Sequence, residues 1–140
     1  MSAAQIRHQV AQAIAACESK KAFDVSVLKL DASSSGFTDY FLVCSGANPR
    51  QIQAISDEVE EKLERAGLRA THVEGRQQAE WVLLDYVDFV VHIFSERARR
   101  FYDLERLWKS AQRLDPASLQ AKPKRSATAS RPRRKPARRR

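Results

Sequence analysis

Two apolar runs, "WVLLDY" at 81–86 and "FVVHIF" at 89–94, limit the fold of this chain more than any other feature. They follow each other almost without a break, because only Val87 and Asp88 lie between them. Aspartate is a common turn residue, so the spacing predicts a β-hairpin with a tight turn near Asp88. A hairpin with acids beside the turn could carry either a catalytic site or a recognition surface.

Side chains alternate across a strand, which places Trp81, Leu83 and Asp85 on one face and Tyr86 on the other. Trp81 stands at the entrance of the first strand, and large aromatic side chains are favoured as interface anchors. Asp85, on the same face, could pair with a basic partner. The same pattern also fits a core indole beside a solvated carboxylate. This face therefore has a functional interpretation, docking onto a basic protein, and a purely structural one.

The catalytic interpretation finds little support in the residues. Metal-dependent phosphoryl transfer needs carboxylates that converge on one face, but Asp85 and Asp88 are three residues apart and separated by the turn. His92 is a lone histidine within a strand, and His72 and His8 have no companions at metal-ligand spacing. The sequence predicts no enzyme, no metal site and no cofactor.

The other elements follow from apolar periodicity and capping residues. A helix is expected over 3–17 and a strand over 25–30, followed by a nearly all-apolar strand over 40–46 that is typical of a central position. Asn48 and Pro49 then open the best-defined helix, which Gly67 ends. The segment "THVEG" supplies another strand, and two short helices follow Ser95 and Asp103. This order predicts a mixed sheet packed with helices, α/β or α+β, with undetermined strand order.

Charge divides the chain at residue 115. Residues 116–140 contain ten basic side chains, no acid and four of the five prolines, although the whole chain has a net charge of only +8. We expect residues 1–115 to fold as one domain and the tail to remain disordered. The tail is interpreted either as a solvated extension or as an arm that contacts RNA phosphates. The expected contacts in the second case are Arg133, Arg134, Lys135, Arg138, Arg139 and Arg140.

Cys17 and Cys44 each lie within an apolar pattern and are expected to be buried thiols. No apolar run approaches the roughly 18 residues of a membrane span. The N-terminal residues lack the continuous apolar core of a signal peptide. A cytoplasmic protein without membrane contact is expected.

Several stretches together resemble the ribosomal silencing factor family, also called the Iojap-related family. They are "TDYFLVCSGANPRQIQAISDEVEEKLERAG", "HVEG", "AEWVLLDYVDFVVHIF" and "RRFYDLERLW", in the same order and with matching gaps. The resemblance covers about residues 4–112. It implies an α/β fold similar to nucleotidyltransferases but without their catalytic set.

The resemblance also implies a homodimer that binds ribosomal protein L-fourteen on the intersubunit face of the large ribosomal subunit. Binding there blocks joining of the small subunit and lowers translation under nutrient limitation. Carried over by motif, the recognition surface lies on the "EWVLLDY" and "VVHIF" strands. Within these strands we expect the contact residues to be Trp81, Leu83, Asp85, Tyr86 and Phe94.

Two alternatives remain open. One is a nucleotidyltransferase-like enzyme, which requires metal-binding carboxylates that the sequence does not assemble. The other is a general nucleic-acid binder that acts through the basic tail, whose affinity would fall steeply with salt.

Overall fold

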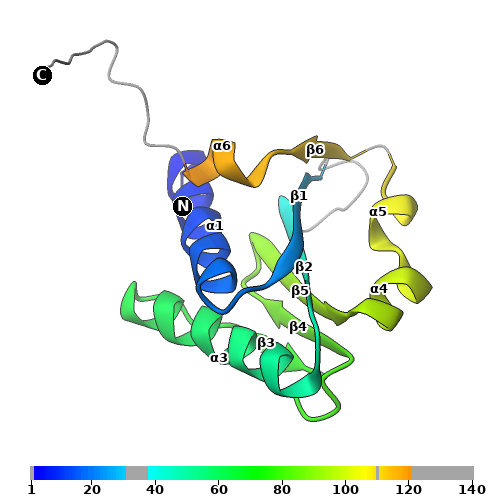
Figure 1. The fold of residues 1–140 in the computed structure, drawn as a ribbon. Coiled ribbons are helices and arrows are strands. Elements are labelled where there is room, and N and C mark those ends of the chain that lie inside the picture. The colour runs from blue at the N-terminus through cyan, green and yellow to red at the C-terminus, as the bar shows by residue number, and fades with distance from the viewer. Residues whose placement is uncertain (1, 31–37, 110, 121–140) are drawn as a thin grey trace, which may run out of the picture.

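The computed structural model describes residues 2–30, 38–109 and 111–120, and these form one mixed sheet packed with helices (Figure 1). The strand order is β3-β4-β5-β2-β1-β6. β2 and β5 pair in parallel, and the other neighbouring strands pair antiparallel. The strands are β1 (Phe23–Lys29), β2 (Tyr40–Gly46), β3 (His72–Glu74), β4 (Trp81–Asp85), β5 (Phe89–Ser95) and β6 (Gln112–Leu114). This architecture confirms the α/β fold class.

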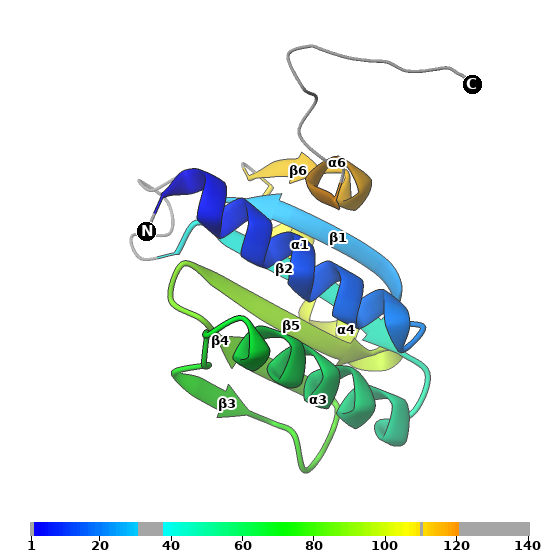
Figure 2. The ribbon, with the colours of Figure 1, turned by 90° about the vertical axis from the view of Figure 1, so that its left-hand side faces the viewer.

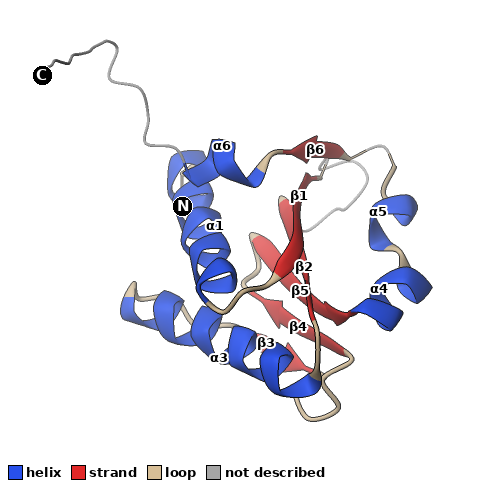
Figure 3. Cartoon of the chain, viewed as in Figure 1, coloured by secondary structure: helices blue, strands red, loops and turns tan. Residues whose placement is uncertain are grey.

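The helices cover the two faces of the sheet unequally. α1 and α3 lie side by side on one face, and α6 packs beside α1 near the β6 edge (Figures 1 and 2). The shorter α4 and α5 lie on the opposite face, where α4 contacts β5 and β2 (Figure 3). The helices are α1 (Ala3–Ser19), α3 (Pro49–Arg65), α4 (Glu96–Tyr102), α5 (Leu104–Leu107) and α6 (Pro116–Gln120).

α3 forms as the sequence predicts. The Asn48 side chain accepts a hydrogen bond from the Gln51 N–H at 2.8 Å, and Pro49 occupies the first turn. A stripe of buried residues faces the sheet, and the helix ends just before Gly67, whose φ of +88° suits glycine. The stripe consists of Ile52, Ile55, Ser56, Val59 and Leu63. Capping and periodicity together therefore determine this element.

Each face of the sheet has its own hydrophobic core. The larger core lies under α1 and α3 and contains Cys17 and Cys44, whose Sγ atoms are 3.9 Å apart. Both side chains are buried, which confirms the prediction for the cysteines. The smaller core lies under α4 and α5 and includes Phe41, Phe94 and Leu104. In the described part of the chain, no helix is long and apolar enough to cross a membrane.

The β4–β5 hairpin is confirmed, with Trp81 opposite Phe94. Val87 adopts a positive φ of 73° in the turn. Asp88 lies in the turn as predicted, but the carboxylate that bonds the turn backbone belongs to Asp85. Its Oδ1 accepts the Val87 N–H at 2.8 Å. The turn is therefore held from the strand that precedes it.

The sequence did not indicate β6 or α6. α6 occupies residues 116–120, so ordered structure extends over the first five residues of the predicted tail. The reason is Leu119, which is 7% exposed and packs into the larger core. The remaining tail, with all six residues expected to contact RNA, lies outside the described residues.

A partly buried ion pair fastens α4 and α5 to the sheet. Arg99 Nη2 lies 2.5 Å from Glu105 Oε2, which also accepts a hydrogen bond from Ser26 Oγ at 3.0 Å. Arg99 Nη1 donates to Ser45 Oγ at 2.9 Å. Burial alone would raise the pKa of Glu105, but the hydrogen bonds and charge of Arg99 outweigh it and lower that pKa. The pair thus links both helices to β1 and β2.

Replacing Glu105 with alanine should lower the free energy of unfolding by about 2 kcal/mol, because the Arg99 guanidinium loses its partner in a partly buried position. Urea unfolding followed by circular dichroism measures this change. The matched control is Glu61→Ala, which breaks an exposed pair with Arg65 at 3.8 Å and should cost no more than about 0.5 kcal/mol. Equal losses in the two variants would contradict the fastening role.

Candidate functional site

The candidate site is the outer face of β4, called here the β4 surface and made of Trp81, Leu83 and Asp85. All three side chains are half-buried, whereas Val82 and Leu84 between them are fully buried in the larger core. The register places the three residues opposite Phe94, His92 and Val90 of β5, respectively. The predicted alternation therefore brings the aromatic anchor and the acid to one face.

The loop before β4 sets the position of Trp81. Gly75 has a φ of +82°, and a Cβ atom there would lie 1.9 Å from the carbonyl oxygen of Trp81. Arg76 binds both carboxylate oxygens of Asp57 on α3, with hydrogen bonds of 2.9 and 2.8 Å. The loop is thus fixed to α3, and only glycine permits the close approach to β4.

The indole of Trp81 is enclosed by aromatic side chains on its inner side. Its ring stacks on Phe94 with a centroid distance of 5.1 Å, and Tyr102 of α4 lies 4.5 Å away. The indole Nε1–H donates a hydrogen bond to His92 Nδ1 at 3.1 Å. These contacts hold the indole in one orientation while its outer part remains exposed. The indole is thus partly buried in the smaller core and partly exposed, which leaves both interpretations of Trp81 open.

His92 completes this arrangement as a buried neutral acceptor. Its side chain is 3% exposed, and burial lowers its pKa to about 3. The Trp81 hydrogen bond needs the lone pair of Nδ1, so the ring proton resides on Nε2. Nε2 has no hydrogen-bond partner among the described residues. Phe41 packs edge-on against the ring at 4.6 Å. His92 is therefore a positioning residue beneath the β4 surface, a role that its isolated place in the sequence did not reveal.

Asp85 combines a structural role with an available charge. One carboxylate oxygen is used by the turn, and the other lies 3.9 Å from Nδ1 of His72 on β3. Its side chain keeps 31% exposure. Asp85 can therefore still meet a cation from solvent at the end of the β4 surface.

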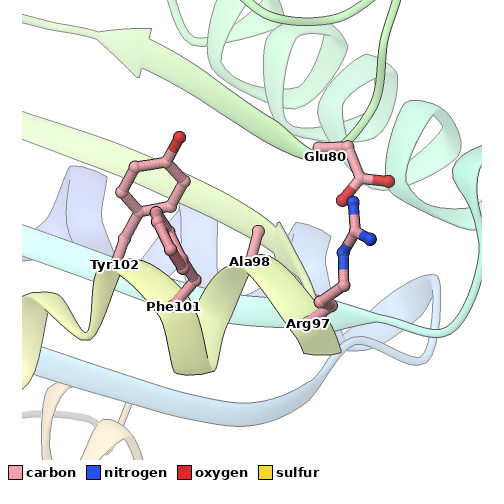
Figure 4. Close-up of a pocket in the computed structure, with 5 residues that line it drawn as sticks. All are labelled: Glu80, Arg97, Ala98, Phe101 and Tyr102. Carbon is pink, nitrogen blue, oxygen red and sulfur yellow. The ribbon is translucent and has the colours of Figure 1, made fainter.

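An open pocket of about 440 Å³ borders the Trp81 end of this surface (Figure 4). Phe101 and Tyr102 stand on α4 on one side of it, and Glu80 lies at the entrance to β4 on the other. Tyr102 belongs to the candidate site by contact with Trp81, but it is not among the contact residues expected from the sequence. The aromatic pair in "RRFYDLERLW" was the available signal, because two adjacent rings on a short helix cannot both be buried against one sheet.

Two of the five predicted contact residues are not accessible. Tyr86 is 3% exposed and lies in the larger core on the opposite face, where it stacks on Phe89 at 5.0 Å. Phe94 shares the face of Trp81 but is fully buried beneath the indole. Neither side chain is exposed for a direct contact in this structure, because Tyr86 follows the strand alternation to the other side and Phe94 supports Trp81 from below. Among the described residues, no group of three His, Cys, Asp or Glu side chains could hold a metal ion.

Burial of neutral His92 predicts a pH-dependent stability. Between its ordinary pKa of about 6.5 and its folded value near 3, the unfolded chain binds a proton that the folded chain does not. The free energy of unfolding should therefore fall as the pH drops below about 6.5, by up to about 1.4 kcal/mol per pH unit. Urea titrations from about pH 7 to pH 5 should show this slope in the wild type and a shallower one in His92→Gln. Identical slopes would contradict the buried neutral ring.

The chain is similar to proteins of a known family. The family described as ribosomal silencing factor during starvation matches residues 3–139. A ribosomal silencing factor of Bacillus subtilis is 40% identical over 103 residues, which are 74% of this chain and 86% of that protein. A mouse protein named mitochondrial assembly of ribosomal large subunit protein 1 is 26% identical over 92 residues, 64% of this chain and 40% of that protein.

The fold is shared as well. A crystal structure of a protein from Chromobacterium violaceum has a TM-score of 0.69 and 33% sequence identity, and the match covers 82% of this chain and 92% of that one. The family resemblance read from the sequence is thereby confirmed. This chain belongs to the family of ribosomal silencing factors during starvation.

Proposed function

We propose that this chain represses translation by binding ribosomal protein L-fourteen on the large ribosomal subunit through the β4 surface. Occupation of that position would prevent the small subunit from joining. No bond is made or broken in this mechanism, so the extent of repression depends on affinity and on the steric conflict. The chain would act in the cytoplasm and, as the family resemblance implies, as a homodimer.

The observation that carries the proposal is the half-exposed indole of Trp81, held in one orientation by Phe94, Tyr102 and His92. A rigid aromatic anchor loses little conformational entropy on binding, which is why such residues dominate interface energies. Asp85 at the other end supplies a negative charge for a basic protein. The name of the mouse relative, which refers to the large ribosomal subunit, agrees with a partner on that subunit.

Trp81→Ala should weaken binding to isolated ribosomal protein L-fourteen and to large subunits by about 2 kcal/mol or more, roughly thirtyfold in Kd. Biolayer interferometry with purified protein measures this, after circular dichroism has shown that the variant is folded. Tyr86→Phe is the matched control, because its hydroxyl is buried on the other face. It should bind like the wild type. A folded Trp81→Ala variant with unchanged Kd would remove the β4 surface from the interface.

The basic tail supports a second, subordinate proposal, an arm that contacts ribosomal RNA near the docking site. The contacts would include Arg133, Arg134, Lys135, Arg138, Arg139 and Arg140. The observation in its favour is ten positive charges without an acid in residues 116–140. Such a segment gains affinity by phosphate neutralisation and counterion release, independently of base sequence.

Deletion of residues 121–140 tests the arm and leaves α6 with its buried Leu119 in place. Binding to isolated L-fourteen should stay the same, whereas binding to whole large subunits should weaken and depend less steeply on salt. Sedimentation with subunits at several KCl concentrations gives both quantities. An unchanged affinity and an unchanged salt slope would mean that the tail is a solvated extension.

A further inference from the structure

We propose that the solvent-facing side of α4 and α5 is a second binding surface and that its partner is RNA with an unpaired base. We call it the α4–α5 surface. It comprises Arg97, Arg100 and the ring of Phe101 on α4, Arg106 on α5 and Lys109 just after α5. The inference rests on the proposed function, because the large ribosomal subunit would present RNA beside the protein that the β4 surface binds.

Charge is distributed unevenly over the folded part of the chain. Residues 96–109 hold five basic and three acidic side chains, whereas the other residues of 1–115 hold ten basic and fourteen acidic ones. Glu105 is engaged internally by Arg99 and Arg113. The four remaining cations are exposed, and in the described part of the chain none of them pairs with a carboxylate. Residues 96–109, with five basic against three acidic side chains, are thus net positive on a body that is otherwise negative.

An exposed aromatic ring, that of Phe101, lies next to these cations in the chain. Phe101 is 78% exposed, which is a high value for a ring on a helix. It lies one helical turn after Arg97 and directly after Arg100. Exposed rings flanked by arginines bind single-stranded nucleic acid, because every base can stack on a ring while its phosphate meets a cation. Phe101 and the neighbouring arginines therefore fit a nucleotide.

The open pocket beside Phe101 adds a polar group that suits a base. Phe101 and Tyr102 contribute rings, Arg97 a cation and Glu80 a carboxylate (Figure 4). One oxygen of Glu80 accepts a hydrogen bond from Ser95 Oγ at 2.8 Å. The other oxygen can accept from the exocyclic amino group of a base, a pairing that carboxylates make with cytosine.

The same arrangement fits a protein partner less well. The centre of a protein interface is depleted in charged residues. Here Arg97 and Arg100 flank the exposed ring, so a protein partner would have to desolvate or neutralise both. A polyanion neutralises all the cations of the surface at once. Charge complementarity therefore favours RNA.

The first test changes charge in the full-length chain. Arg100→Gln with Arg106→Gln should reduce the slope of log K against log salt, measured with whole large subunits, by about 1.4 to 1.8. Binding to isolated L-fourteen should not change. The matched control is Arg65→Gln with Arg69→Gln, which removes two exposed charges near the end of α3 on the opposite side of the sheet. The control should keep the wild-type slope.

The second test separates stacking from plain apolar contact. Phe101→Leu keeps an apolar side chain but removes the ring, so it should weaken subunit binding roughly tenfold if a base stacks there. A protein partner would accept leucine with little loss. The assay again uses whole subunits and isolated L-fourteen in parallel.

The possible outcomes are distinguishable. An unchanged salt slope in the double variant, or an equal loss on isolated L-fourteen, would overturn the RNA assignment while leaving the proposed function intact. A wild-type chain that fails to bind large subunits at all would overturn both. Loss confined to whole subunits, with the reduced slope and the Phe101 effect, would support the RNA surface.

Discussion

The parallel pairing of β2 with β5 is the constraint on which the rest of the structure depends. Both strands are buried on both faces, so each face of the sheet must be covered there. On one face the long helices α1 and α3 provide this cover over most of the sheet. On the other, α4 and α5 are short, and α4 packs on β5 and β2. The outer face of β4 consequently remains half-open, and that is where Trp81, Leu83 and Asp85 lie.

This unequal cover explains why the candidate site is built into the sheet rather than added on a loop. The indole of Trp81 belongs partly to the smaller core and partly to the surface, so folding of that core also orders the residue proposed as the anchor. His92 contributes without reaching the surface, by offering a buried acceptor to the indole. Fastening of α4 by the Arg99–Glu105 pair keeps Tyr102 against the same ring. The side chains that stabilise this face are therefore the same ones that form the proposed recognition surface.

Local pattern was enough to predict the elements whose signals lie close together in the chain. Alternation assigned Trp81, Leu83 and Asp85 to one strand face, and capping with periodicity defined α3. Pairing between distant segments has no such local pattern. Only the structure therefore reveals that β2 lies beside β5 and that β6 forms a short edge strand. Tyr86 shows the limit within a motif, because membership of the motif does not place its side chain on the face of Trp81. The aromatic contact from Tyr102 depends on how α4 packs, which no local pattern encodes.

Subunit joining gives the most direct test of the proposed repression. Purified small and large ribosomal subunits would be mixed with increasing amounts of the chain, and the joined fraction would be followed by light scattering. We expect the chain to lower the joined fraction as it saturates the large subunit, and an excess of isolated ribosomal protein L-fourteen to restore joining by sequestering the chain. A chain that saturates large subunits yet leaves the joined fraction unchanged would contradict the central claim.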